Sequence, residues 1–194
     1  MRISMRSVAL ILAAGASSRL GEPKSLVEIN GKTVYQHTVN KLRKAGIQSI
    51  FCVTRQELSV DIVLGAESVN VVVNLEPELG RTGSIQQGLL SILKSEKKTP
   101  NCVLIVPVDR PSWDEKTIND LLAQESASAP ISGGHPMIIF ENDIQSILVA
   151  EKDAPLRDVI NFERIYTSEI EQVNLDYPED IEKLKSLSSI IFKE

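Results

Sequence analysis

A loop of small residues followed by two cations carries the clearest chemistry in the sequence. The loop opens with side chains that are apolar or absent: Leu12, Ala13, Ala14 and Gly15. Such residues let backbone N–H groups approach an anion, and Arg19 and Lys24 follow with fixed positive charge. Pro23 fixes the approach of the chain to Lys24. We interpret the segment as a phosphate-binding loop; the alternative is a glycine-containing turn with two solvated cations.

The position and the residue spacing of this loop limit the kinds of ligand that it could bind. It follows the apolar run 8–13 directly, and ligands of an open α/β sheet bind beyond the carboxyl ends of its strands. Its spacing matches neither GxGxxG nor GxxxxGK(S/T), so the dinucleotide-binding and Walker interpretations lose support.

Asp109 is a candidate metal ligand because it ends another apolar run. Its carboxylate should emerge at the same edge of the sheet, where a hard oxygen ligand suits Mg²⁺ carried by a nucleoside triphosphate. The alternative is that Asp109 caps the helix expected after Pro111. A capping role is the favoured interpretation for Asp180, in the first turn of a helix that Pro178 would begin.

Two further segments combine glycine with polar side chains. Gly80 and Gly83 break the chain ahead of an expected helix, so Ser84 and nearby N–H groups could contact a base or ribose. The alternative is that Thr82 or Ser84 caps this helix. His135 stands in a forced bend between a glycine and a proline, and a lone histidine is more often structural than catalytic.

The elements that must position these residues follow an α/β pattern. Short β-branched apolar runs alternate with amphipathic runs, which predicts a parallel sheet covered by helices on both faces. Strands are expected at 8–13, 49–54, 69–74 and 102–108, and helices at 33–45, 57–64, 82–93 and 117–124.

The pattern changes after about residue 125, where small polar residues precede an apolar strand at 137–140. We expect an inserted or antiparallel segment there. Beyond it the sequence predicts helices at 143–149 and 155–161, a strand near 171–175 and a last helix from Pro178. Because no internal repeat, linker or low-complexity tract interrupts the sequence, residues 1–194 are expected to form a single domain.

Composition excludes several classes of protein. With 42% hydrophobic and 24% charged residues, the chain is neither disordered nor fibrous in type. A net charge of −5 argues against a nucleic-acid partner. Cys52 and Cys102 lie in apolar runs and are expected as buried thiols in a cytoplasmic protein. No apolar stretch reaches the roughly 18 residues of a membrane span, although the run after Arg2 and Arg6 also resembles a short secretory signal.

Five blocks of the sequence, read together, resemble one known family. The segment from Leu12 to Lys24 matches every position of LAAGxSxRxGxPK, the signature of the molybdenum-cofactor nucleotidyltransferases. The other blocks follow in the family's order: GRTGS with the later Gly88-Leu89, PVDRP at 107–111, Gly134-His135-Pro136 with Phe140, and NLDYPED at 174–180.

This resemblance implies a three-layer, Rossmann-like fold of the nucleotide-diphospho-sugar transferase type with about seven strands. It also implies transfer of a nucleotidyl group from a nucleoside triphosphate to a phosphorylated acceptor, with release of pyrophosphate. By resemblance, Asp109 and Asp176 hold Mg²⁺, Lys24 and Arg19 act with Asp109 in catalysis, and His135 lies on the acceptor side. The expected nucleotide-binding residues are Leu12, Ala13, Ala14, Gly15, Arg19, Lys24, Gly80, Ser84 and Asp109.

The resemblance also bears on the two substrates. In the family, an Ala-Ala-Gly loop goes with cytidine transfer and a Gly-Gly loop with guanosine transfer, so the residues at 13–15 favour CTP. Molybdopterin is the acceptor that the resemblance implies. The alternatives are a nucleotidyltransferase acting on a sugar phosphate or polyol phosphate, and a non-catalytic nucleotide-binding regulator.

The sequence departs from the family pattern at three places, and the changes at Arg110 and in the segment 152–157 keep the sugar- or polyol-phosphate alternative open. Arg110 replaces a frequent Gln and adds a cation near the expected metal, which points to a more anionic acceptor. Asn174 and Tyr177 replace the usual Asp and Thr of the last block. The segment 152–157 retains only the aspartate and the arginine of a frequent Gly-Asp-x-Gly-Ala-Arg element.

Overall fold

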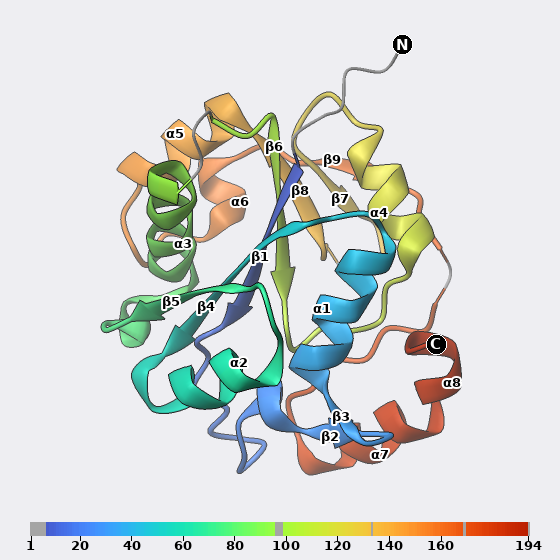
Figure 1. The fold of residues 1–194 in the computed structure, drawn as a ribbon. Coiled ribbons are helices and arrows are strands. Elements are labelled where there is room, and N and C mark those ends of the chain that lie inside the picture. The colour runs from blue at the N-terminus through green and yellow to red at the C-terminus, as the bar shows by residue number, and fades with distance from the viewer. Residues whose placement is uncertain (1–6, 96–98, 133, 169, 194) are drawn as a thin grey trace.

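A seven-stranded sheet forms the centre of the computed structural model, which describes residues 7–95, 99–132, 134–168 and 170–193 (Figure 1). In the order β5-β4-β1-β6-β8-β7-β9, the strands are Asn70–Asn74, Ser49–Arg55, Ser7–Ala13, Cys102–Pro107, Met137–Phe140, Ser128–Pro130 and Glu163–Ile165. Only β8 runs against the others in this sheet, since it is antiparallel to both β6 and β7. The expected mostly parallel sheet, with an antiparallel segment after residue 125, is therefore confirmed.

Helices cover both faces of the sheet (Figure 1). On one face lie α1 (Val34–Lys44), α2 (Ser59–Gly65), α4 (Glu115–Leu122), α7 (Pro178–Ser186) and α8 (Ser188–Ile191). On the other lie α3 (Arg81–Ser95), α5 (Glu141–Val149) and α6 (Leu156–Val159). Short helical turns occupy Lys24–Leu26, Gln56–Leu58 and Pro77–Leu79, and β2 (Glu28–Ile29) pairs with β3 (Lys32–Thr33). The three-layer fold class is confirmed.

The first apolar run forms the central strand β1. Val8 and Leu10 pack into the core beneath α3, whereas Ala9 and Ile11 pack into the core beneath α1, and all four are fully buried. Burial on both faces explains why the run is continuously apolar rather than alternating. Arg2 and Arg6, which gave the run its likeness to a secretory signal, lie outside the described residues.

The predicted strand near 171–175 is wrong. Val173 and Leu175 are buried and alternate with more accessible neighbours, which imitates a half-buried strand. Their N–H groups donate elsewhere, to the Oγ of Ser112 and to the carbonyl oxygen of Asp109, both at 2.9 Å. The segment is thus hydrogen-bonded to the loop after β6 and is not a strand of the sheet.

Two expectations from composition can be compared with this fold. Cys52 and Cys102 are free and buried, as expected. In the part of the chain that the structure describes, no helix has the length and apolar character needed to cross a membrane.

Gly88 permits α3 to lie close to the sheet. A Cβ added at Gly88 would stand 2.4 Å and 2.6 Å from the methyl carbons of Leu10 and 2.9 Å from one of Val53. Gly88→Ala should therefore lower the free energy of unfolding by about 1–3 kcal/mol through overpacking. Chemical denaturation measures this change. Gly15→Ala is a useful control, because a Cβ there meets nothing within 4 Å.

Lys41 of α1 is enclosed by aromatic side chains. Its Nζ lies 4.1 Å from the ring centroid of Trp113 and donates a hydrogen bond to the carbonyl oxygen of Pro111 at 2.7 Å. Burial lowers the pKa of Lys41 from 10.5 to about 7, and the nearby Asp114 offsets this shift in part. At neutral pH the Lys41 amine therefore binds a proton less readily than it does in an unfolded chain.

This shift predicts a pH-dependent stability. Between pH 7 and 10.5 the unfolded chain binds the Lys41 proton more strongly than the folded chain does, so this residue makes folding more favourable as pH rises. We compare the free energy of unfolding of the wild type with that of Lys41→Met. The difference between the two should increase over this window by at most about 1.4 kcal/mol per pH unit. Denaturation of both proteins at several pH values measures this difference. If the free energies of unfolding of the two proteins changed in parallel with pH, the lowered pKa of Lys41 would be contradicted.

Candidate active site

The carboxyl ends of β1 and β6 meet at one edge of the sheet and open into a cavity of about 400 Å³, here called the loop cavity. The N–H of Val108 donates to the carbonyl oxygen of Leu12 at 3.1 Å, which holds the two strand ends together. The cavity brings together all ten residues predicted for nucleotide, catalysis and metal: Leu12, Ala13, Ala14, Gly15, Arg19, Lys24, Gly80, Ser84, Asp109 and Asp176. Their placement matches the predicted site, while their roles remain predictions.

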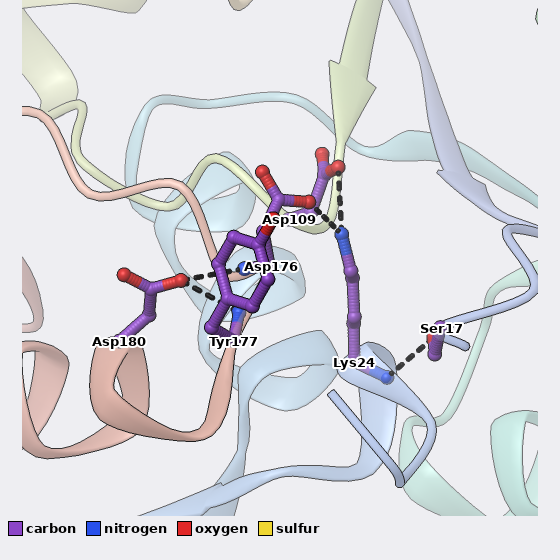
Figure 2. Close-up of polar contacts among 6 residues, drawn as sticks. All are labelled: Ser17, Lys24, Asp109, Asp176, Tyr177 and Asp180. Carbon is purple, nitrogen blue, oxygen red and sulfur yellow. Dashed lines mark hydrogen bonds and ion pairs between the residues drawn. The ribbon is translucent and has the colours of Figure 1, made fainter. Parts of the chain in front are cut away.

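Ser17 organises the loop that follows β1. Its φ of +53° is unusual for a residue with a side chain, and its carbonyl oxygen accepts from the N–H groups of Leu20 and Gly21, both at 3.2 Å. Its hydroxyl accepts from the backbone N–H of Lys24 at 3.1 Å (Figure 2). The loop therefore returns on itself and directs Lys24 into the cavity.

Lys24 joins the two aspartates of the site (Figure 2). Its Nζ lies 2.7 Å from Oδ1 of Asp176 and 3.4 Å from Oδ2 of Asp109. Three segments that are distant in the sequence supply these groups: the turn after the loop, the end of β6 and the segment before α7. One ammonium group thus pairs with two carboxylates at the edge of the cavity.

Backbone contacts explain how Asp176 reaches this position. The N–H of Leu175 donates to the carbonyl oxygen of Asp109, which places the next residue beside the end of β6. Oδ2 of Asp180 accepts from the N–H groups of Asp176 and Tyr177, at 2.9 Å and 2.7 Å (Figure 2). The predicted capping role of Asp180 is therefore confirmed.

The alternative in which Asp109 caps the following helix is wrong. Asp114 occupies the N-cap of α4 and accepts from the N–H of Thr117 at 2.8 Å. Asp109 lies five residues earlier and faces the cavity and Lys24. Its carboxylate is thus available for a ligand.

Positive charge favours the ionised form of Asp176. The hydrogen bond from Lys24 lowers the pKa of Asp176 below its ordinary value, and the charges of Lys24, Arg19 and Arg110 act in the same direction. Arg19 is exposed, with its guanidinium carbon 5.9 Å from the ring centroid of Tyr177. The cavity therefore combines the carboxylates of Asp109 and Asp176 with cations that can meet an anionic ligand.

The two aspartates also fit a magnesium ion. Oδ1 of Asp109 is buried and has no hydrogen-bond partner among the described residues, so it is free to accept a ligand. Within those residues no group of three or more His, Cys, Asp and Glu side chains is arranged to hold a metal ion. Mg²⁺ commonly binds through only one or two carboxylates and takes its remaining oxygens from phosphate and water. Asp109 and Asp176 meet that requirement.

Gly80 and Ser84 line the loop cavity at the start of α3. The Oγ of Ser84 accepts from Nδ2 of Asn74 at 3.0 Å and lies 3.4 Å from the carbonyl oxygen of Gly80. The hydroxyl of Thr82 donates to the carbonyl oxygen of Ala154 at 2.6 Å, so it fastens α3 to the segment before α6. Ser84 has its own internal partners and still borders the space where a nucleotide could lie.

His135 lies in a second cavity of about 710 Å³, here called the arginine cavity because Arg81, Arg110, Arg157 and Arg164 line it. Arg81 also lines the loop cavity, so the two spaces adjoin. Burial, and then the charges of Arg81, Arg110 and Arg164, lower the pKa of His135 to about 3. Its imidazole is therefore neutral and suited to hydrogen bonding rather than to carrying charge.

Sequence reasoning missed two of these arginines. Arg81 lies inside the GRTGS block but was not singled out, although a cation beside a phosphate-binding segment could have been noted. Arg164 belongs to β9, a strand of three residues that the sequence pattern did not reveal. Arg164 reaches the cavity that holds His135 because β9 pairs with β7 in the sheet.

Comparison with known proteins identifies the class to which this fold and site belong. Residues 9–170 match the MobA-like NTP transferase domain. The chain therefore belongs to this family of nucleotidyltransferases, and the resemblance found in the sequence is confirmed.

Individual relatives differ in name. The chain is 26% identical over 152 residues to a molybdenum cofactor guanylyltransferase from Xanthomonas euvesicatoria pv. vesicatoria, covering 78% of this chain and 67% of that protein. It is 33% identical over 126 residues to the bifunctional protein GlmU of Clostridium botulinum, covering 60% of this chain but only 25% of that longer protein. The inositol-1-phosphate CTP transferase from T. maritima shares the fold, with a TM-score of 0.75 at 16% identity over 100% of this chain and 98% of that one.

Proposed function

We propose that this protein transfers a nucleotidyl group, with CTP as the favoured donor, to a phosphorylated small molecule in a Mg²⁺-dependent reaction. The observation that carries the proposal is the meeting of Lys24, Asp109 and Asp176 beside a loop suited to phosphate. A non-catalytic regulator needs the loop and its cations but not two carboxylates facing them. The buried, unpaired cysteines favour a cytoplasmic location for this reaction.

The transfer needs positioning and charge more than covalent chemistry. An oxygen of the acceptor's phosphate attacks the α-phosphorus, and a new P–O bond forms there. The bond from the α-phosphorus to the bridging oxygen breaks, and pyrophosphate leaves with the electron pair. The attacking oxygen of a phosphate monoester is already ionised at neutral pH, so no general base is required. Rate enhancement then comes from alignment and from neutralising the developing charge.

The chain's own residues divide this work. Lys24 neutralises charge on the α-phosphate, Arg19 contacts the departing phosphates, and N–H groups of the loop bind phosphate oxygens. Asp109 and Asp176 would hold Mg²⁺, which supplies charge neutralisation of the triphosphate oxygens. The carboxylates of Asp109 and Asp176 share the Lys24 ammonium in this structure. When Lys24 contacts a phosphate instead, these carboxylates need another cation, which favours a bound Mg²⁺.

The identity of both substrates is part of the proposal. The Ala-Ala-Gly form of the loop favours CTP. The Xanthomonas relative is named for guanylyl transfer and the T. maritima neighbour for CTP transfer, so the other triphosphates need direct comparison. Molybdopterin is the first acceptor to test, and sugar or polyol phosphates are the second candidate class, because Arg110 and the segment 152–157 depart from the pattern of the molybdenum-cofactor proteins.

Thermal unfolding with each nucleoside triphosphate tests donor binding without an acceptor. At 100 times its dissociation constant, a ligand stabilises the folded state by about 2.7 kcal/mol. We expect a Mg²⁺-dependent shift that is largest with CTP, followed by pyrophosphate release when a phosphorylated acceptor is added. A larger shift with another triphosphate would reassign the donor. The absence of any shift, together with no pyrophosphate release in the presence of acceptors, would overturn the proposed function.

A further inference from the structure

The arginine cavity has an apolar floor built by four adjacent strands. Ile105 of β6 is paired with Met137 of β8, and Ala129 of β7 is paired with Arg164 of β9, all lining the same cavity. The small side chain of Ala129 leaves room above the sheet. A volume of about 710 Å³ is in the range of small-molecule sites.

Cations surround this apolar floor. Arg81 is at the start of α3, Arg110 follows β6, and Arg164 projects from β9. Neither Arg81 nor Arg164 makes an ion pair with any residue that the structure describes. Asp153 is the sole acidic side chain along the described lining. Such an excess of positive charge favours an anionic occupant.

His135 adds a neutral polar group to the same wall. Its Nδ1 is buried and has no hydrogen-bond partner within the described part of the chain. An unpaired buried nitrogen costs free energy unless a ligand or water satisfies it. The imidazole can therefore contribute a hydrogen bond to an occupant of the arginine cavity.

The positions of the arginines indicate how many anionic groups the occupant carries. Arg81 lines both cavities, so it is placed to meet the acceptor phosphate that attacks the nucleotide. Arg110, Arg164 and His135 line the arginine cavity but not the loop cavity. One phosphate at the junction of the cavities leaves room for a further anion beside Arg164, which makes no ion pair with a described residue, and beside the unpartnered Nδ1 of His135.

Building on the proposed function, we propose that the acceptor is a phosphate monoester with a second anionic group, which Arg110, Arg164 and His135 bind in the arginine cavity. The second group is a carboxylate or a further phosphate, because a guanidinium binds either with two parallel hydrogen bonds. It takes no part in bond making. It holds the acceptor so that its other phosphate faces the loop cavity.

Binding of paired probes tests this inference independently of turnover. The chain has two histidines, so the imidazole signals of His135 can be assigned by NMR with a His37→Gln variant. One pair of probes is 3-phosphoglycerate and glycerol 3-phosphate, which differ by a carboxylate; the other is glucose 1,6-bisphosphate and glucose 1-phosphate, which differ by a phosphate. We expect the doubly anionic member of at least one pair to shift the His135 signals with at least 10-fold tighter binding. The pair that shows this difference identifies the second anionic group as a carboxylate or a phosphate.

Arg164→Met provides the matching variant. Arg164 is exposed on an outer strand, so its replacement should leave the unfolding midpoint nearly unchanged. The variant should lose the preference for doubly anionic probes and keep the stabilisation by CTP and Mg²⁺. Arg43→Met, on the opposite face of the sheet, should retain both properties.

The outcomes separate this inference from the proposed function. Equal binding within both pairs, no shift of His135 with any probe, or an undiminished preference in Arg164→Met would overturn the inference, even if nucleotide binding and pyrophosphate release persist. Absence of nucleotide binding and of transfer would overturn the proposed function instead, whatever the probes show.

Discussion

Replacing Asp109 by Asn is expected to lower kcat by at least about 100- to 1,000-fold, because it removes a negative charge at the reacting phosphates without changing the shape of the side chain. In this structure Asp109 combines a buried, unpartnered Oδ1 with an Oδ2 that lies 3.4 Å from Lys24. An amide can neither hold Mg²⁺ as strongly nor neutralise the lysine. Pyrophosphate release at saturating CTP and acceptor measures the loss.

Two controls make this result specific to Asp109. The variant should unfold close to the wild-type midpoint, since Asp109 is not the cap of a helix and its side chain is partly exposed. Asp61→Asn, in the first turn of α2 and outside the lining of the loop cavity, should retain full activity. Activity of Asp109→Asn that recovers at saturating Mg²⁺ would remove Asp109 from an essential role.

Lys24→Met is expected to change two measurements in opposite directions. Loss of the ammonium should lower kcat by about 100-fold or more, because charge on the α-phosphate is no longer neutralised. It should also tighten the binding of Mn²⁺ in the absence of nucleotide, because Lys24 competes with a metal ion for the carboxylates of Asp109 and Asp176. A purely structural lysine would not produce this second effect.

Calorimetric titration with Mn²⁺ and the transfer assay together test the dual role of Lys24. Lys94→Met, at the exposed end of α3, is the matched control and should change neither measurement. If Lys24→Met weakened Mn²⁺ binding, the lysine would be supporting the metal site rather than competing for it, and the proposed division of charge would be wrong.

The sequence was sufficient for the central strands because each of them is buried on both faces. Runs such as that of β1 are continuously apolar and end in a recognisable loop. The last two strands of the sheet, β7 and the edge strand β9, have three residues each, too few to display a period. The error at 171–175 has the opposite cause, since Val173 and Leu175 show strand-like alternation while their N–H groups bond to Ser112 and Asp109.

The position of the candidate site could be anticipated where its residues lie in short motifs, whereas their roles remain predictions. Lys24 and Asp109 could be selected from their place after apolar strands, and Asp176 came from resemblance. Their mutual contact depends on tertiary packing that no local pattern encodes. The arginine cavity was less predictable for the same reason, because Arg81, Arg110 and Arg164 come from three separate elements.

The separation of Lys24 from its partners also sets the order in which the site can be completed during synthesis. Asp109 lies 85 residues after Lys24 and Asp176 lies 152 residues after it. A ribosome therefore delivers the phosphate-binding loop first, the end of β6 next and the second carboxylate last. Until that last segment emerges, the nascent chain carries a cationic loop with only one of its two carboxylate partners.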